Sequence, residues 1–93
     1  MKVFVVSYDL RQPDRDYSGL FDELKKSPAW WHYLESTWLI STNETANQLY
    51  KRLRPHIDNN DLILVIEAGR DRQGWLPKKA WEWIQKSLGG YIR

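Results

Sequence analysis

The sequence predicts an α+β domain in which helices cover one face of a four-stranded antiparallel sheet. Residues 3–6 and 62–66 are runs of consecutive apolar and mostly β-branched side chains, which are typical of strands buried on both faces. Residues 17–24 and 46–57 carry apolar side chains at the spacing of a helix face. Residues 30–34 and 37–41 are rich in aromatic and β-branched residues, as paired strands are.

The first strand is expected over residues 3–10, and a loop over residues 11–14 follows it. Asp14 and Asp16 are candidate N-caps of the first helix. The apolar face of this helix is formed by residues at i, i+3, i+4 and i+7, namely Tyr17, Leu20, Phe21 and Leu24. Pro28 ends the helix, because the residue before a proline avoids helical backbone angles.

The two aromatic-rich stretches are interpreted as a hairpin with Glu35 and Ser36 as its tight connection, although one long bent strand would also fit. A second helix follows, which residues 42–44 are expected to cap. Pro55 should kink or end that helix. Residues 58–61 form a turn before the last strand.

The end of the chain predicts an additional helix. Residues 69–74 are a polar loop with Arg70 and Arg72, and Pro77 suits a first helical position. The helix is expected over residues 76–88, with Gly89 and Gly90 ending it and residues 91–93 as a tail. One face of it holds Trp81, Ile84 and Leu88, and we expect the tryptophans of this segment, Trp75, Trp81 and Trp83, to attach it to the body. The chain is therefore one domain over residues 1–93, with a core over 1–68 and a helical extension over 69–93.

This order of elements is the ferredoxin-like βαββαβ pattern with one extra C-terminal helix. Right-handed crossovers give the strand order fourth, first, third, second, with both core helices on one face. The end of the first strand should then lie beside Glu35–Thr37 and beside the turn at 58–61, with Arg70 and Arg72 at the opposite end. The helix-free face needs a cover, which can be the final helix, a second copy of the chain, or both.

Composition narrows the functional class. The 93 residues include no cysteine, so no disulfide, thiolate nucleophile or cysteine-ligated metal is expected. No apolar run reaches the roughly 20 residues of a membrane span, and the start does not resemble a signal peptide, so we expect a cytoplasmic protein without membrane contact. A net charge of +2 permits nucleic-acid binding without arguing for it.

Asp9 is the main candidate for chemistry, because a carboxylate at the mouth of a central strand can bind a metal or activate water. The alternative is a strand-end aspartate that makes a turn with Arg11. Arg11 and Arg15 are candidates for phosphate contact, or else ordinary solvated charges. Trp38 is a candidate for base stacking, as are Trp30 and Trp31, although packing in a core or dimer is the other use of such residues.

Three segments resemble the superfamily of CRISPR-associated protein two, whose relatives include virulence-associated protein D and small SinR-like proteins. They are residues 5–10, which end in Tyr8-Asp9-Leu10; Ser36-Thr37-Trp38; and residues 57–61, with Asp58 and Asp61. The resemblance covers roughly residues 1–68. The loop at 11–16 matches the basic loop of that superfamily only loosely, and the tryptophan-rich extension is not its usual swapped strand.

The resemblance implies a ferredoxin-like homodimer in which Asp9 of each copy faces the other and holds one Mg²⁺ or Mn²⁺ ion. Tyr8 matches the neighbour of that aspartate, and Ser36 and Trp38 match the serine and the aromatic residue of the third strand. In a cleavage mechanism we expect Tyr8 and Ser36 to orient the substrate. Some members cleave RNA or DNA, and others only bind nucleic acid within a larger assembly. We therefore expect a nucleic-acid-handling homodimer with metal-dependent endoribonuclease or nuclease activity, and the alternative is a non-catalytic module that binds nucleic acid, a nucleotide or a protein.

Overall fold

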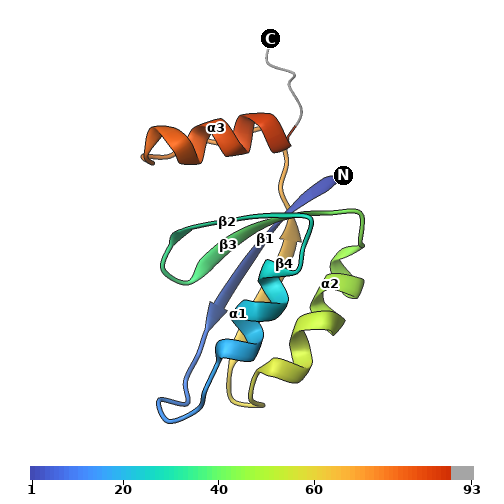
Figure 1. The fold of residues 1–93 in the computed structure, drawn as a ribbon, viewed down its shortest axis with the longest axis vertical. Helices are drawn as coiled ribbons and strands as arrows, with labels where there is room; N and C mark the ends of the chain where they lie inside the picture. Colours follow the sequence, from blue (N-terminus) through green and yellow to red (C-terminus); the bar gives the residue numbers. More distant parts are fainter. Residues whose placement is uncertain (89–93) are drawn as a thin grey trace.

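The computed structural model of the chain describes residues 1–88. Its elements follow the predicted order (Figure 1), and they are β1 (Lys2–Asp9), α1 (Ser18–Lys25), β2 (Ala29–Leu34), β3 (Thr37–Thr42), α2 (Ala46–Leu53), the short 3₁₀ helix η1 (Arg54–His56), β4 (Leu62–Glu67) and α3 (Lys78–Ser87). The tight β2–β3 connection at Glu35 and Ser36 confirms the hairpin. The expected end of the last helix at Gly89 and Gly90 and the tail at 91–93 lie outside the described residues.

The four strands form one sheet in the order β2-β3-β1-β4, and every neighbouring pair is antiparallel. The register places Ser7 opposite Thr37 of β3 and opposite Leu64 of β4. Asp9 lies opposite Leu62, at the beginning of β4. The ferredoxin-like α+β fold with an extra C-terminal helix is thereby confirmed, including the central place of β1.

The main core lies between the sheet and the helix pair α1 and α2, which run side by side over one face (Figure 1). Alternate residues of β1 point into it, namely Phe4, Val6 and Tyr8. The helices contribute Leu20, Leu24, Leu49 and Leu53, each with no exposed surface. These leucines lie at the spacing of one helix face, which explains why α1 and α2 dock by those sides.

The helix ends correct two details of the prediction. The N-cap of α2 is Thr45 rather than a residue of 42–44, because Thr45 and Gln48 form a reciprocal capping box. In α1 the N-cap position is Tyr17, which makes no side-chain cap bond, while Asp16 Oδ1 accepts a hydrogen bond from the Ser18 N–H at 2.9 Å. Pro55 ends the α-helix as expected, since the chain continues from Arg54 as one 3₁₀ turn.

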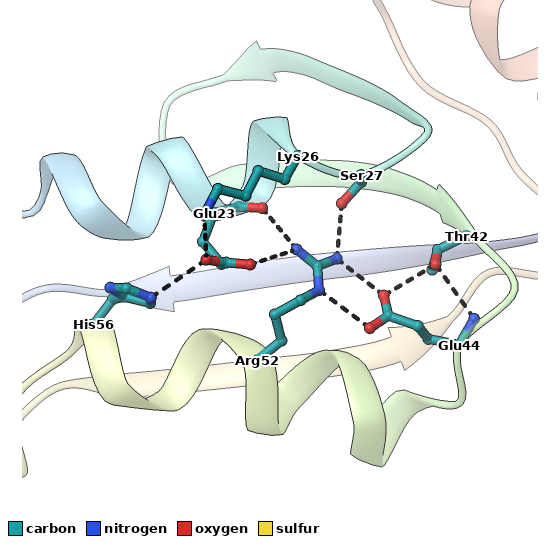
Figure 2. A network of polar contacts seen from close by, with 7 residues as sticks. All are labelled: Glu23, Lys26, Ser27, Thr42, Glu44, Arg52 and His56. Atoms are coloured by element: carbon teal, nitrogen blue, oxygen red, sulfur yellow. Dashed lines mark hydrogen bonds and ion pairs between the residues drawn. The ribbon is translucent and has the colours of Figure 1, made fainter.

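A polar network centred on Arg52 joins α1 to α2 (Figure 2). The Arg52 guanidinium donates to the Glu23 carbonyl oxygen at 2.7 Å, to Ser27 Oγ at 2.9 Å and to both carboxylate oxygens of Glu44 at 2.9 and 3.1 Å. It also pairs with the Glu23 carboxylate at 3.3 Å, which His56 Nε2 approaches to 3.5 Å. The network therefore fixes how the two helices lie on the sheet.

The extra helix α3 packs on the other face of the sheet, over β2. Trp31 is buried there with Ala80 and Ile84, and its Nε1 donates to the Ala80 carbonyl oxygen at 3.2 Å. The expectation for Trp75 is wrong, because this side chain is 99% exposed in the loop before the helix and attaches nothing. Among residues 1–88, no helix has the length and apolar character that crossing a membrane requires.

Candidate functional site

Asp9 is the last residue of β1, and its side chain is 61% exposed on the sheet face opposite α1 and α2. Its Oδ2 accepts hydrogen bonds from Arg11 Nε at 3.1 Å and from Arg11 Nη2 at 3.0 Å. This ion pair is the strand-end turn expected as the alternative use of Asp9. Exposed pairs of this kind contribute about 0–1 kcal/mol, so a stronger ligand could displace Arg11 from the carboxylate.

The neighbours of Asp9 on this face follow from strand alternation and register. Ser7 lies two residues back on the same face, and its Oγ is 3.1 Å from Thr37 Oγ1 of β3. Leu62 and Leu64 of β4 lie opposite Asp9 and Ser7. A shallow depression of about 250 Å³ is lined by Ser7, Asp9, Leu62 and Leu64, together with Tyr8 and Ile63 of the same strand segments. A carboxylate, two hydroxyls and an apolar wall therefore meet at one end of the open face.

Tyr8 is not on this face. Its side chain lies in the core under α1, where the hydroxyl accepts a hydrogen bond from Trp38 Nε1 at 3.0 Å. Burial raises the pKa of the Tyr8 phenol, although the Trp38 hydrogen bond acts in the opposite direction. The structure thus separates Tyr8 from Asp9, because adjacent residues of a strand point to opposite faces.

Trp38 is also in the core, with 1% of its surface exposed. The His32 ring stacks on it at 4.0 Å between centroids, and Phe21 lies on it at 6.2 Å. No face of this indole is open to a base, so the structure does not place it with the predicted nucleic-acid contacts. Ser36 is exposed in the β2–β3 turn, and its carbonyl oxygen accepts a hydrogen bond from the Tyr8 N–H at 3.1 Å.

Asp61 organises the loop that carries Arg11 and Arg15, a role that the sequence interpretation missed. Its carboxylate accepts hydrogen bonds from the Arg11 N–H at 2.7 Å, from the Asp58 N–H at 2.8 Å and from the Tyr17 hydroxyl at 2.7–2.8 Å. Arg15 pairs with Asp58 at 3.7 Å in the same region. The signal in the sequence is an acid between a turn and an apolar strand, where the acid can cap the loop backbone.

Burial alone would raise the pKa of Asp61, but the hydrogen bonds from Arg11, Asp58 and Tyr17 outweigh it and hold the pKa below its usual value. Asp61 therefore remains ionised and fully engaged with the loop. It is not available as a second ligand beside Asp9.

The described part of one chain does not form a metal site by itself. No group of three or more His, Asp or Glu side chains within residues 1–88 is arranged to hold an ion. Asp9 supplies one carboxylate, and Arg11 competes for it. Magnesium usually takes one or two carboxylates and keeps several waters, so a second chain would have to supply the other carboxylate.

No family model matches the chain, and no solved structure matches it. The function is therefore inferred from the residues themselves and from their arrangement.

Proposed function

We propose that this protein acts as a homodimer that handles nucleic acid, with metal-dependent cleavage of a phosphodiester at a site shared by two copies of Asp9. The observation that carries the proposal is the position of Asp9. It is an exposed carboxylate at the end of the central strand, on the face that α1 and α2 leave open, and two hydroxyls lie on the same face.

The open half of that face supports the dimer. Helix α3 covers β2, while Leu62, Leu64 and Ile66 of β4 remain 53–58% exposed in a row. Val5, Ser7 and Asp9 of β1 lie opposite them. A second copy packed on this apolar stripe (Leu62, Leu64 and Ile66) would bury it and bring the two Asp9 side chains toward each other.

The proposed roles follow from the chemistry of each group. The two Asp9 carboxylates of a dimer would together hold one Mg²⁺ or Mn²⁺, and such an ion would supply a bound water of lowered pKa and positive charge beside the scissile phosphate. Arg11, once released from Asp9, would be a phosphate contact, and Arg15 lies in the same loop. Ser7 and Thr37, whose hydroxyls lie on the same sheet face as the carboxylate, replace Tyr8 in this proposal, and Ser36 stays as an exposed candidate at the adjoining turn.

Asp9→Asn tests the shared site. Two carboxylates that face each other without a metal repel, so the variant should melt at the wild-type temperature or above it in EDTA. Wild type should gain stability with Mn²⁺, by about 2.7 kcal/mol at a hundredfold excess over the dissociation constant, and the variant should not. Cleavage of mixed RNA and DNA should be lost in the variant. The measurements are melting curves with and without Mn²⁺ and a gel assay of cleavage.

Asp22→Asn is the matched control, because Asp22 is an exposed aspartate on α1 and the substitution changes the charge equally. It should keep both the Mn²⁺ response and cleavage. If Mn²⁺ shifts neither wild type nor the variant and no substrate is cut, the nuclease proposal is refuted.

A binding module without catalysis is the second candidate, and a specific observation favours it. The Asp9 carboxylate is already paired with Arg11, and Tyr8 and Trp38 are committed to the core. Such a module would bind nucleic acid, a nucleotide or a protein and leave it uncut. Binding without cleavage, unchanged in Asp9→Asn, is the result that supports this candidate.

A further inference from the structure

Charge is divided unevenly along the chain. Residues 1–68 contain eight Lys and Arg against ten Asp and Glu, whereas residues 69–93 contain six against two. The body therefore carries a net charge of −2 and the extension +4, which together make the overall +2. Concentration of positive charge in one segment is the electrostatic signature of a surface that binds polyanions.

The structure places part of this charge around a depression at the extension. The depression has a volume of about 410 Å³ and is lined by Arg70, Arg72, Gln73, Trp81 and Gln85. The loop passes close to the helix there, since a Cβ placed on Gly74 would lie 3.8 Å from Trp81 Cζ2. Within the loop, Arg72 Nη1 donates to the Arg70 carbonyl oxygen at 2.9 Å. Guanidinium groups, an indole and two side-chain amides thus meet at one place.

Each of these groups has a counterpart in a nucleotide. Guanidinium groups bind phosphate oxygens with two donors at a time. Side-chain amides both donate and accept, as the edges of bases do. An indole offers a flat surface on which a base can stack.

The same loop carries a second indole. Trp75 follows Gly74 directly and is 99% exposed, with no packing role in the described structure. Ala80 and Ile84 of helix α3 pack on Trp31 and fix the helix to the sheet. The depression therefore lies beside a helix that is packed on the body of the protein. Lys78 and Lys79 are exposed in the first turn of that helix.

We infer that the loop over residues 69–77 and the adjoining side of α3 bind single-stranded nucleic acid, with phosphates on Arg70 and Arg72 and unpaired bases on Trp75 and Trp81. Single strands fit better than duplexes, because stacking on an indole requires an unpaired base. The inference deepens the proposed function, since it names a binding surface and a strandedness for the nucleic acid.

This surface lies away from Asp9. The extension leaves the sheet beside Val3, where the Ala68 N–H donates to the Val3 carbonyl oxygen at 2.8 Å. Asp9 lies six positions after Val3 on β1, which is roughly 20 Å at about 3.3 Å per residue. Binding at the extension and cleavage at Asp9 can therefore be tested separately.

The test is fluorescence anisotropy with a labelled 12-nucleotide single-stranded RNA, repeated with the matching DNA, in EDTA so that no metal-dependent cleavage takes place. The Arg70→Gln/Arg72→Gln variant should bind at least tenfold more weakly at low salt. Its plot of log K against log salt should be shallower by about 1.4, because each phosphate contact on a single strand contributes about 0.7. Trp75→Ala should weaken binding roughly fivefold or more, and its folding should be unaffected because the side chain is exposed.

Lys25→Gln/Lys51→Gln is the matched control, since it removes the same charge from exposed positions on α1 and α2. It should bind within about twofold of wild type, and the annealed duplex should bind more weakly than either single strand. Melting curves confirm that each variant is folded.

Three outcomes overturn the inference: wild-type affinity in both extension variants, equal affinity for duplex and single strand, or no binding of either single strand. Cosedimentation with vesicles that contain phosphatidylglycerol tests the other polyanion, and Trp75-dependent binding to vesicles but not to RNA would also overturn it. If wild type binds single-stranded nucleic acid at the extension but cleaves none with Mn²⁺ present, the nuclease proposal is refuted and this inference stands.

Discussion

Asp9 and Asp61 stand at the same end of the sheet, and their surroundings give them different roles. Asp9 is exposed, and its one partner among the described contacts is Arg11. Asp61 is 7% exposed and accepts hydrogen bonds from two backbone N–H groups and from the Tyr17 hydroxyl. The buried carboxylate therefore shapes the loop after β1, while the exposed one remains available for a ligand.

Asp61→Ala should destabilise the protein by about 1–3 kcal/mol, because the N–H groups of Arg11 and Asp58 lose their acceptor. Urea unfolding at pH 7 measures this cost. Asp14→Ala, an exposed loop substitution with the same change in charge, should cost less than about 0.5 kcal/mol. Equal stability of the two variants would show that Asp61 does not hold the loop.

At the scale of elements, the Arg52 network connects α1 to α2 in a pH-dependent way (Figure 2). The hydrogen bonds from Arg52 lower the pKa of Glu44, although partial burial opposes them. Burial would raise the pKa of Glu23, but Arg52 and Lys26 outweigh it and lower that pKa as well. Carboxylates with a lowered pKa stabilise the folded state above the unfolded pKa of about 4.3, and this stabilisation is lost as the pH falls through the folded pKa.

Arg52→Met should therefore reduce stability at pH 7 by about 1–3 kcal/mol, since the two glutamates lose a partly buried partner. The difference between wild type and variant should narrow between about pH 5 and pH 3, because the glutamates become protonated in both. Urea unfolding midpoints across that range provide the measurement. Lys51→Met changes the same charge on the exposed side of α2 and should differ little from wild type at every pH. If the stability difference between wild type and Arg52→Met stays constant with pH, the ion pairs of Arg52 with Glu23 and Glu44 are not its cause.

At the scale of the whole molecule, the two faces of the sheet are covered unequally (Figure 1). Helices α1 and α2 bury one face, and α3 packs on the other at β2, with Leu39 of β3 also against this cluster. The apolar stripe of Leu62, Leu64 and Ile66 on β4 is left exposed, and β4 is an edge strand. Exposed edge strands with apolar side chains tend to pair or to be covered by another chain.

If a second copy covers the stripe, Leu64→Lys should convert a dimer into a monomer, because a charge at the centre of an apolar contact is costly to bury. Sedimentation velocity at micromolar concentration should give twice the chain mass for wild type and the chain mass for the variant. Tyr50→Lys is the control, since Tyr50 is an exposed aromatic residue on α2, away from the stripe, and this variant should remain dimeric. A monomeric wild type would refute the dimer and the shared site together.

Much of the fold could be predicted from the sequence, because the signals are local. Apolar runs and helical spacing located every strand and α-helix of residues 1–88, and the Pro55 stop and the hairpin at Glu35 and Ser36 were predicted correctly. The strand order followed from the order of elements, since right-handed crossovers leave few arrangements. Strand alternation alone separates Tyr8 from Asp9 and places Ser7 on the same face as Asp9. The prediction that Tyr8 belongs to the site followed from its position next to Asp9 in the sequence and did not take this alternation into account.

Tertiary structure alone decided the burial and the partners of the candidate residues. Trp38 is in the core and Trp75 is exposed, although both are tryptophans beside apolar segments in the sequence. Asp61 is engaged by Tyr17, 44 positions away, and Trp31 is covered by Ala80, 49 positions away. By itself the sequence determined which elements form and in what order they pair, because propensity and periodicity act over a few residues. Which side chains remain open to a ligand depends on contacts between residues distant in sequence, and only the folded chain brings those together.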